Sequence, residues 1–556
     1  MNKYIGLTVV AFCMCLVSCD DYLDKLPDNR AALDTEKKIV TLLTSAYPEN
    51  DFILVNELLA DNIDDDGETN PYSTRFLEQV YYWEDVTETN NEDPNHIWTT
   101  SYDAIISANQ ALAAIDELGS NSSSMQQARA EALLCRAYGH FVLVNEFCKH
   151  YNSATSDNDL GIPYMTELEE QLNLHHERGT VKEVYENIDK DIQEALPLIG
   201  DDNYDVPKFH FNQKAAYAFA TRFYLFYEQW DKVVQYASQC LGTNPGTMLR
   251  DWNVMATMTQ DRDVITKYYI GSSINSNLLL MTAYSNLGVF FGSYTTWKRF
   301  SHHRFVAQNE TVMAPQVWGT NGTEGYYMTP KVYSGSNYDF VILWRLPYLF
   351  EYTDPVAGIG YRRTIYPAFT TDEVLLSRAE AYIMLNQYDN AINDMNLWVH
   401  NINKTTTELT KDIIVDFYKN MNYCYEFVDN NGNVVREDGL VSTPKKHLHP
   451  AFTIGDEGSD QECLLQCVLC LRRIETLQMG LRWWDIKRYG IEIPRRVMDA
   501  NGSPAKVTDW LRVNDERRAI QIPVDVVSAG IEPNPRVVSS NDNDLGEELQ
   551  PININE

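Results

Sequence analysis

The amino-acid sequence predicts a mainly α-helical protein. Antiparallel helix pairs of the tetratricopeptide kind form a superhelical scaffold, and loop-rich insertions with short strands interrupt it. Three observations lead to this fold class. Segments before residue 200 place apolar residues at helical spacing, two later segments repeat one helix–turn–helix pattern, and the chain between these two lacks long helical periodicity. With 44% hydrophobic and 22% charged residues in 556, the composition is that of a folded globular chain.

The helical segments before residue 200 have recognisable end signals. Residues 101–118 form one predicted helix, and a cluster of Gly, Ser and Asn follows it as a turn. Residues 125–150, rich in Ala, Leu and Arg, form a second helix. Thr180, with Glu183 three positions later, predicts a capping box that opens a third helix, and Pro197 ends it.

Two later segments, residues 214–241 and 372–399, resemble each other. Each begins with a helix of small residues, continues through an aromatic–aspartate pair that starts at Trp230 or Tyr388, and ends in a second helix. Small residues let antiparallel helices approach closely and the aromatic ring fills the gap between them, as in tetratricopeptide repeats. Because the two copies lie far apart in the chain, the pattern indicates a helical scaffold with long insertions instead of a tandem array.

The predicted organisation is one large domain preceded by a signal peptide. The insertion is rich in Tyr, Trp, Gly, Ser, Thr and Asn, a texture typical of functional loops. A later irregular segment contains Asp429-Asn430-Asn431-Gly432, which favours a hairpin turn. We expect a signal peptide at 1–18, a single domain at 19–556, helical scaffold at about 30–245 and 370–525, and a loop-rich ligand-binding insertion at about 250–370.

The first nineteen residues read as an export signal. Lys3 supplies a positive start, and the apolar run that follows is too short to span a bilayer. The ending Leu16-Val17-Ser18-Cys19 resembles a bacterial lipobox, in which the cysteine becomes the first residue and carries lipid. We therefore expect Cys19 to be a lipid anchor. The alternative is ordinary signal-peptidase cleavage after Ser18, which is also small.

Acidic residues outnumber basic ones, 79 to 45, giving a net charge of −34. Nucleic-acid binding requires a clustered basic surface, so this charge excludes nucleic acid as the expected partner. It also opposes electrostatic adsorption to an anionic membrane.

No metal site or cofactor is expected. Cys463, Cys467 and Cys470 share one face of a predicted helix, where three small buried side chains are more typical than metal ligands. The acidic run Asp61–Asp66 suggests calcium at first sight but lacks the twelfth-position Glu of an EF-hand loop, so a solvated loop is favoured.

Four segments carry a resemblance to a known family. They are Cys19-Asp20-Asp21-Tyr22-Leu23-Asp24 with Pro27; Arg129 to Tyr138 followed by Gly161-Ile162-Pro163-Tyr164; Arg472 to Gly490, with Gly480-Leu481-Arg482-Trp483-Trp484-Asp485 at its centre; and Ile520-Gln521-Ile522-Pro523 with Asn534-Pro535. In this order they resemble the SusD/RagB family, surface nutrient-binding lipoproteins of Bacteroidota. The chain departs from the family in its closing peptide, Ser540 to Asp544.

The resemblance implies a fold of four tetratricopeptide-like helix pairs that support a variable ligand face. It implies lipid anchoring in the outer membrane, capture of an oligosaccharide and its delivery to a SusC-like TonB-dependent transporter, without catalysis. The Arg and Lys residues between 472 and 488 are interpreted as scaffold, because ion pairs with nearby acidic residues and positions on solvated faces suffice to explain them.

A sugar site needs aromatic rings for the apolar CH face of the sugar and polar groups for its hydroxyl rim. The resemblance implies an Asp, an Arg and a Trp from N-terminal loops, and Asp66, Arg75 and Trp83 match best by order and spacing. The insertion adds the candidates Tyr294, Trp297 and Trp318. For each aromatic residue the alternative is core or loop packing. The basic stretch at 297–305 either recognises an acidic sugar or neutralises nearby carboxylates, and the second interpretation is favoured.

Three other functions remain open on sequence. The first is capture of peptides, as in the RagB branch. The second is glycoside hydrolysis, which needs two positioned carboxylates that cannot be singled out among 79 acidic residues. The third is a protein-binding scaffold that would use the helix grooves instead of the insertion.

Overall fold

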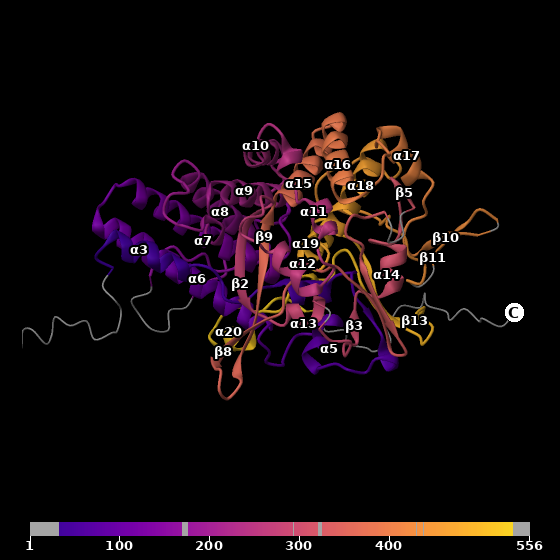
Figure 1. Ribbon diagram of the computed structural model, residues 1–556, viewed down its shortest axis with the longest axis horizontal. Helices are drawn as coiled ribbons and strands as arrows, with labels where there is room; N and C mark the ends of the chain where they lie inside the picture. Colours follow the sequence, from indigo (N-terminus) through magenta and orange to yellow (C-terminus); the bar gives the residue numbers. More distant parts are fainter. Residues whose placement is uncertain are drawn as a thin grey trace, which may run out of the picture.

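The computed structural model describes residues 33–168, 176–292, 294–320, 325–429, 431–436 and 439–536. The expected signal peptide and Cys19 lie outside the described residues. The predicted mainly helical fold is confirmed. Helix pairs form most of the body, and short strands and loops gather along its lower edge and right-hand side (Figure 1).

The N-terminal helices are α3 (Glu36–Leu42), α4 (Ile53–Leu59), α5 (Arg75–Tyr81), α6 (Pro94–Leu118), α7 (Ser123–Phe147) and α8 (Val181–Ala195). The last three match the predicted helices, although α6 begins seven residues before its predicted start. The first three were not predicted, and α5 lies in a stretch expected to be loop. Helix α6 ends at Gly119, whose left-handed φ of 62° suits a residue without a Cβ. Thr180 and Glu183 form the predicted capping box at the start of α8.

The two similar segments form similar helix pairs. The first is α9 (Gln213–Phe226) with α10 (Trp230–Leu241), and the second is α15 (Thr371–Met384) with α16 (Tyr388–Ile402). Glu228 and Asn386 take left-handed φ values of 59° and 58° at equivalent places, two residues before the second helix. The two turns therefore share one geometry, and α10 packs against α15, so the pairs are neighbours in space.

The C-terminal helices complete the scaffold. They are α17 (Lys411–Lys419), α18 (Asp460–Glu475), α19 (Leu481–Arg488) and α20 (Val524–Ser528). The cysteines of α18 are buried free thiols on this helix, which agrees with the structural interpretation of their spacing. Among the residues that the structure describes, no helix has the length and apolar character needed to cross a bilayer.

The insertion contains short helices and small sheets. Its helices are α11 (Trp252–Thr257), α12 (Arg262–Tyr269), α13 (Leu287–Phe291) and α14 (Arg304–Asn309). Its strands are β2 (Asn277–Tyr284), β3 (Phe300–Ser301), β4 (Pro315–Gln316), β5 (Gly319–Thr320), β6 (Lys331–Gly335), β7 (Tyr338–Ile342), β8 (Leu349–Asp354) and β9 (Ile359–Thr370). Strands β2, β9 and β8 form one antiparallel sheet with β9 in the middle, and β4–β5 and β6–β7 are hairpins. The hairpin predicted after residue 428 is also present, between β10 (Glu426–Val428) and β11 (Val434–Arg436).

One mixed sheet joins distant parts of the chain. Its order is β13 (Pro504–Leu511), β12 (Ile493–Met498), β1 (Asp64–Asp65), β3. Strand β1 runs parallel to β12, with Asp65 opposite Val497, and antiparallel to β3, with Asp64 opposite Ser301. This sheet sets the N-terminal loops beside the insertion and the C-terminal hairpin.

Buried ion pairs fix this arrangement. Asp61 receives two hydrogen bonds of 2.9 Å from Arg482 and lies 3.3 Å from Arg473. Burial raises the pKa of Asp61, but the charges of these two arginines outweigh it and hold that pKa well below its usual range. The arginines between 472 and 488 are therefore scaffold, as expected. The expectation that some of them lie on solvated faces is wrong, because each of these arginine side chains is almost fully buried.

Candidate functional site

The candidate site begins where β1 ends. The loop that follows Asp65 and the loop that precedes β3 lie side by side because β1 and β3 pair. The backbone N–H of Arg299 donates to the carbonyl oxygen of Tyr72 over 2.8 Å. The buried amide of Asn70 donates to the carbonyl oxygen of Thr296, also over 2.8 Å. These two hydrogen bonds between the loops fix the position of one loop relative to the other.

Two aromatic rings stack on the surface of these loops. The rings of Tyr72 and Trp297 have centroids 5.0 Å apart and planes only 10° from parallel. Tyr72 is 47% exposed and Trp297 is 68% exposed, so both rings remain open to solvent although each covers one face of the other. We call this pair the aromatic platform. Its flat apolar surface, with hydrogen-bonding groups close by, matches the CH face of a sugar ring.

An open pocket adjoins the aromatic platform. It has a volume of about 830 Å³, and we call it the loop pocket. Its wall comes from the loop after β1, the end of α5, the residue before β3, the β6–β7 turn and the β12–β13 hairpin. Its polar lining residues are Glu68, Thr69, Tyr82, Arg299, Ser336, Asp499, Lys506 and Thr508. A volume of this size is within the range of small-ligand sites, and hydroxyl, carboxylate and amine groups on its wall suit a polyhydroxylated ligand.

Arg299 is neutralised inside the protein. Its guanidinium donates to both oxygens of Asp65, over 2.5 and 2.6 Å, and lies 3.2 Å from Glu78. The hydrogen bonds to Asp65 raise the pKa of Arg299 further above its usual value. Within the same basic stretch, Arg304 pairs with Asp339 at 3.3 Å. This supports internal neutralisation over acidic-sugar recognition.

Asp66 lies beneath the site instead of on it. The side chain is almost fully buried, and the hydroxyl of Ser301 donates to its Oδ2 over 3.2 Å. Burial raises its pKa well above the usual range. The neighbouring Lys298 is also buried, and burial lowers its pKa to about 7. Lys298 donates to the carbonyl oxygen of Phe290 over 2.6 Å, so both residues support the loop from inside.

Two of the predicted ligand residues belong to the core. Trp83 is buried and donates its indole N–H to the carbonyl oxygen of Leu59 over 3.1 Å, with the guanidinium of Arg495 lying 3.8 Å from its ring. Trp318 is buried near Trp398, with ring centroids 6.4 Å apart. Neither ring offers a face to a ligand in solvent, which corrects the expectation for both.

The other predicted ligand residues, Arg75, Tyr294 and Trp297, differ in their exposure and in their contacts. Arg75 is exposed and pairs with Glu84 over 2.7 Å. Tyr294 is half-buried, donates its hydroxyl to Asp263 over 2.6 Å and carries the guanidinium of Arg262 3.4 Å from its ring centre. Trp297 is therefore the one aromatic candidate among those predicted whose ring lies open on the surface. Its partner Tyr72 was missed; the only local signal is Asn70-Pro71 before it, which favours a turn, and turns usually lie at the surface.

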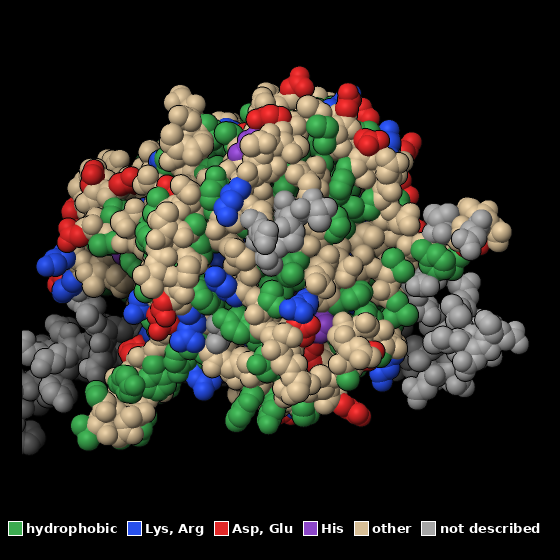
Figure 2. All heavy atoms as spheres, turned by 45° about the vertical axis from the view of Figure 1, so that its right-hand side comes forward, with side chains coloured by type: hydrophobic (Ala, Val, Ile, Leu, Met, Phe, Trp, Pro, Cys, Tyr) green, Lys and Arg blue, Asp and Glu red, His purple; other side chains and the backbone are tan. Residues whose placement is uncertain are grey.

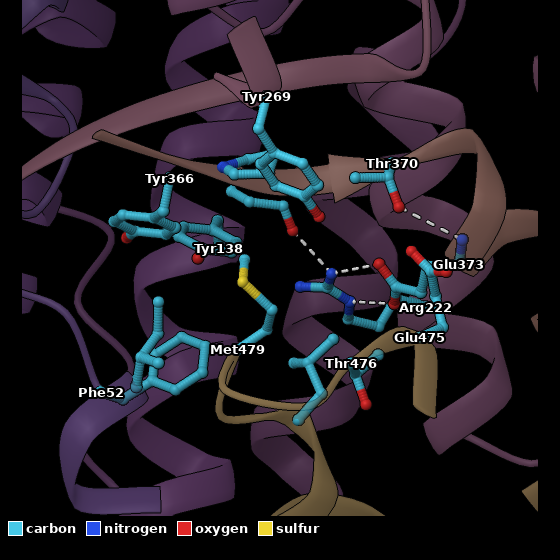
Figure 3. Close-up of a pocket in the computed structure, with 14 residues that line it drawn as sticks. Phe52, Tyr138, Arg222, Tyr269, Tyr366, Thr370, Glu373, Glu475, Thr476 and Met479 are labelled. Carbon is cyan, nitrogen blue, oxygen red and sulfur yellow. Dashed lines mark hydrogen bonds and ion pairs between the residues drawn. The ribbon is translucent and has the colours of Figure 1, made fainter. Parts of the chain in front are cut away.

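Other hollows do not suit a sugar as well. The central cavity in Figure 3 has a volume of about 30 Å³, enough for about one water molecule. Arg222, which donates to Glu373 over 2.7 Å, lines one side of this cavity, and the rings of Tyr138, Tyr366 and Phe52 line the opposite side. A hollow of about 440 Å³ between α6 and β2 lies on the helical scaffold, away from the aromatic platform.

One acid on the wall of the loop pocket, Asp499, does not have the raised pKa of a general acid. Asp499 accepts backbone hydrogen bonds from Ser503 and Asn501, which lower its pKa. A general acid of a glycosidase needs a raised pKa instead. Among the described residues, no group of three or more His, Cys, Asp or Glu side chains is arranged to hold a metal ion.

Comparisons with known proteins agree with one another. The family model described as SusD-like, starch-binding associating with outer membrane, matches residues 21–225. A SusD superfamily protein of Bacteroides thetaiotaomicron is 16% identical, with a TM-score of 0.59 over 91% of this chain and 100% of its own. One of Bacteroides fragilis is also 16% identical, with a TM-score of 0.59 over 89% and 97%. A SusD-like carbohydrate binding protein of Bacteroides vulgatus is 15% identical, with a TM-score of 0.53 over 89% and 96%. No curated protein sequence matches the chain.

Proposed function

The chain belongs to the SusD-like family, and from that premise we propose that it is a cell-surface lipoprotein that captures oligosaccharides without catalysis. It then delivers them to a SusC-like TonB-dependent transporter in the outer membrane. The observation that carries the proposal is the aromatic platform of Tyr72 and Trp297 beside the loop pocket.

The geometry supports binding of more than one sugar unit. One ring stacks on the open face of Trp297, and its neighbours in the oligosaccharide extend into the loop pocket. There the hydroxyl of Thr69 can meet the sugar rim, and that of Thr508, which donates to the carbonyl oxygen of Arg495 over 3.3 Å, can accept from it. The platform is pre-organised, because Tyr72 fixes the indole by stacking and the two cross-loop bonds fix the backbone. A ligand therefore loses little affinity to ordering these groups.

The ligand is neutral under this proposal. Arg299, the guanidinium on the pocket wall, is already compensated by Asp65 and Glu78. The protein carries a net charge of −34, which repels an anionic glycan at long range. Sugar hydroxyls can pair with neutral hydrogen-bonding groups, so that binding does not require a charge to be buried.

Anchoring through lipid on Cys19 belongs to the same proposal. Thirteen residues lie between Cys19 and Leu33, the first described residue, which makes fourteen residue-to-residue steps, and fully extended chain spans at most about 3.3–3.6 Å per step. The tether therefore reaches roughly 45–50 Å. Cys19→Ala, expressed with its signal peptide, should move the protein from the membrane fraction to the soluble fraction. Membrane retention of that variant at the wild-type level contradicts the anchor.

Calorimetry against a panel of neutral and anionic oligosaccharides and peptides tests the binding proposal. We expect binding to a neutral oligosaccharide and no increase in reducing ends during long incubation. If the protein binds peptides and no oligosaccharide, its function is the RagB-like capture of peptides instead. Release of reducing ends makes the protein a glycosidase and refutes the non-catalytic role.

A further inference from the structure

A β-hairpin projects from the lower edge of the molecule. It comprises residues 349–363, the strand β8, the turn after it and the start of β9, and we call it the hairpin arm. Figure 1 shows it reaching below the body, and the projection at the lower left of Figure 2 carries hydrophobic side chains along its length. Strand β8 lies at the edge of its sheet, paired on one side with β9.

The apolar side chains of the hairpin arm are unusually exposed. Val356, at the turn, is 99% exposed, and three others are more than half exposed: Tyr352, Ile359 and Tyr361. Single exposed apolar residues are ordinary on a protein surface, but a group of four on one thin projection marks an interaction site.

The charged residues of the hairpin arm are engaged within the protein. Asp354 accepts the backbone N–H groups of Val356 and Ala357 over 2.9 and 3.0 Å, which caps the turn. Glu351 pairs with Arg363 across the two strands. Arg362 donates to the amide oxygen of Asn286 over 2.7 Å, at the base. The tip therefore carries one carboxylate, that of Asp354, and one of its oxygens is held by the backbone of the turn.

The order of residue types along the hairpin arm matches the depth profile of a bilayer interface. Val356 and Ile359 lie at the end, Tyr352 and Tyr361 lie behind them, and the arginines lie at the base. Aliphatic side chains favour the acyl region, tyrosines the headgroup level and arginines the aqueous side. A protein partner fits less well, because a stable interface buries about 800 Å² per partner, whereas four side chains on a two-stranded ribbon offer a few hundred at most.

We propose that the tip of the hairpin arm inserts into the lipid surface to which the chain is tethered, as a second attachment that orients the molecule. The inference rests on the proposed lipid anchor, which would hold the chain at the membrane. The attraction is apolar instead of electrostatic. With a net charge of −34, the protein should bind zwitterionic vesicles better than anionic ones.

Vesicle co-sedimentation tests the inference with the whole mature chain carrying Cys19→Ala, so that no acyl chain contributes. We expect binding to phosphatidylcholine vesicles and weaker binding to vesicles enriched in phosphatidylglycerol. The double variant Val356→Asp/Ile359→Asp should bind roughly tenfold or more weakly, because it removes two aliphatic side chains from the contact. Val434→Asp is the matched control, since Val434 is also exposed, on the β10–β11 hairpin, and this change should leave vesicle binding unaltered.

A fluorescent probe locates the contact. The described cysteines are buried, so a thiol introduced by Val356→Cys reacts selectively with an environment-sensitive dye. Its emission should shift to the blue when phosphatidylcholine vesicles are added. The inference is overturned if the chain carrying Cys19→Ala alone does not bind vesicles, or if the double Asp variant binds them equally well. A dye shift that requires a purified transporter and is absent with vesicles also overturns it and makes the arm a protein contact.

Glycan titration of the double variant separates this inference from the proposed function. The hairpin arm lies outside the aromatic platform and the loop pocket, so the affinity of the variant for oligosaccharide should equal that of the wild type. Loss of vesicle binding with intact glycan binding supports the inference. Absence of glycan binding in the wild type refutes the proposed function and leaves the vesicle result to be judged on its own.

Discussion

Replacing Trp297 by alanine should weaken oligosaccharide binding about 30-fold while the fold is kept, on the relation of about 1.4 kcal/mol per factor of ten. Trp297 is 68% exposed and contacts Tyr72 on one face, so its removal leaves no cavity in the core. A sugar ring that covers roughly 80 Å² of the open indole face contributes about 2 kcal/mol at about 25 cal/mol per Å².

Isothermal titration calorimetry, with the best oligosaccharide from the panel, measures this loss. Trp297→Phe keeps a smaller ring and should give an intermediate affinity. Tyr361→Ala removes an exposed aromatic ring from the hairpin arm and should change nothing. Circular dichroism should show the same unfolding midpoint for all four proteins. If Trp297→Ala and Tyr72→Ala both bind with wild-type affinity, the aromatic platform is not the sugar site.

Three further outcomes follow from buried groups. Asp61→Ala leaves Arg473 and Arg482 without their shared partner and should lower the free energy of unfolding in urea by about 3–5 kcal/mol; a loss below about 1 kcal/mol would contradict the network. Trp83→Ala should cost about 3–5 kcal/mol because it opens a core cavity, yet the folded fraction should bind sugar normally, and reduced affinity there would restore Trp83 to the site. Burial and the nearby charge of Glu92 raise the pKa of Asp51 to about 7. The stability that the neutral carboxyl contributes is fully present below the unfolded-state pKa of Asp51, near 4, and is lost as pH rises through about 7. Asp51→Asn should therefore flatten this decline in the free energy of unfolding, measured by urea titration at several pH values. An unchanged pH profile would contradict the prediction.

The scaffold was predictable because its signals are local. Helical spacing, the capping box of Thr180 and Glu183, and the turn at Gly119 each depend on neighbouring residues, so a single sequence reveals them. The similarity of residues 214–241 and 372–399 also identified two helix pairs that share a left-handed residue at the same place in the turn.

The site was only partly predictable because its residues lie in segments without periodicity. Trp83 lies just after α5 and Trp297 in the loop before β3, each next to polar residues, and nothing local distinguishes the buried ring from the open one. The difference comes from long-range packing: Arg495, more than four hundred positions away in the chain, lies over Trp83. Tyr72 becomes a ligand candidate only after β1 pairs with β3 and places it beside Trp297.

The parallel pairing of β1 with β12 has a consequence for the timing of folding. Arg495 donates to the carbonyl oxygens of Leu58, Leu59 and Ala60 over 2.8–2.9 Å, so the strand that begins the ligand loops is held by residues near the end of the chain. Contacts this distant in sequence form late and slowly, after the entropy of closing a very long loop has been overcome. A partly synthesised chain can thus complete many of its helices but not the sheet that positions the proposed sugar site. The aromatic platform and the loop pocket should therefore form only after residues 493–511 have been synthesised.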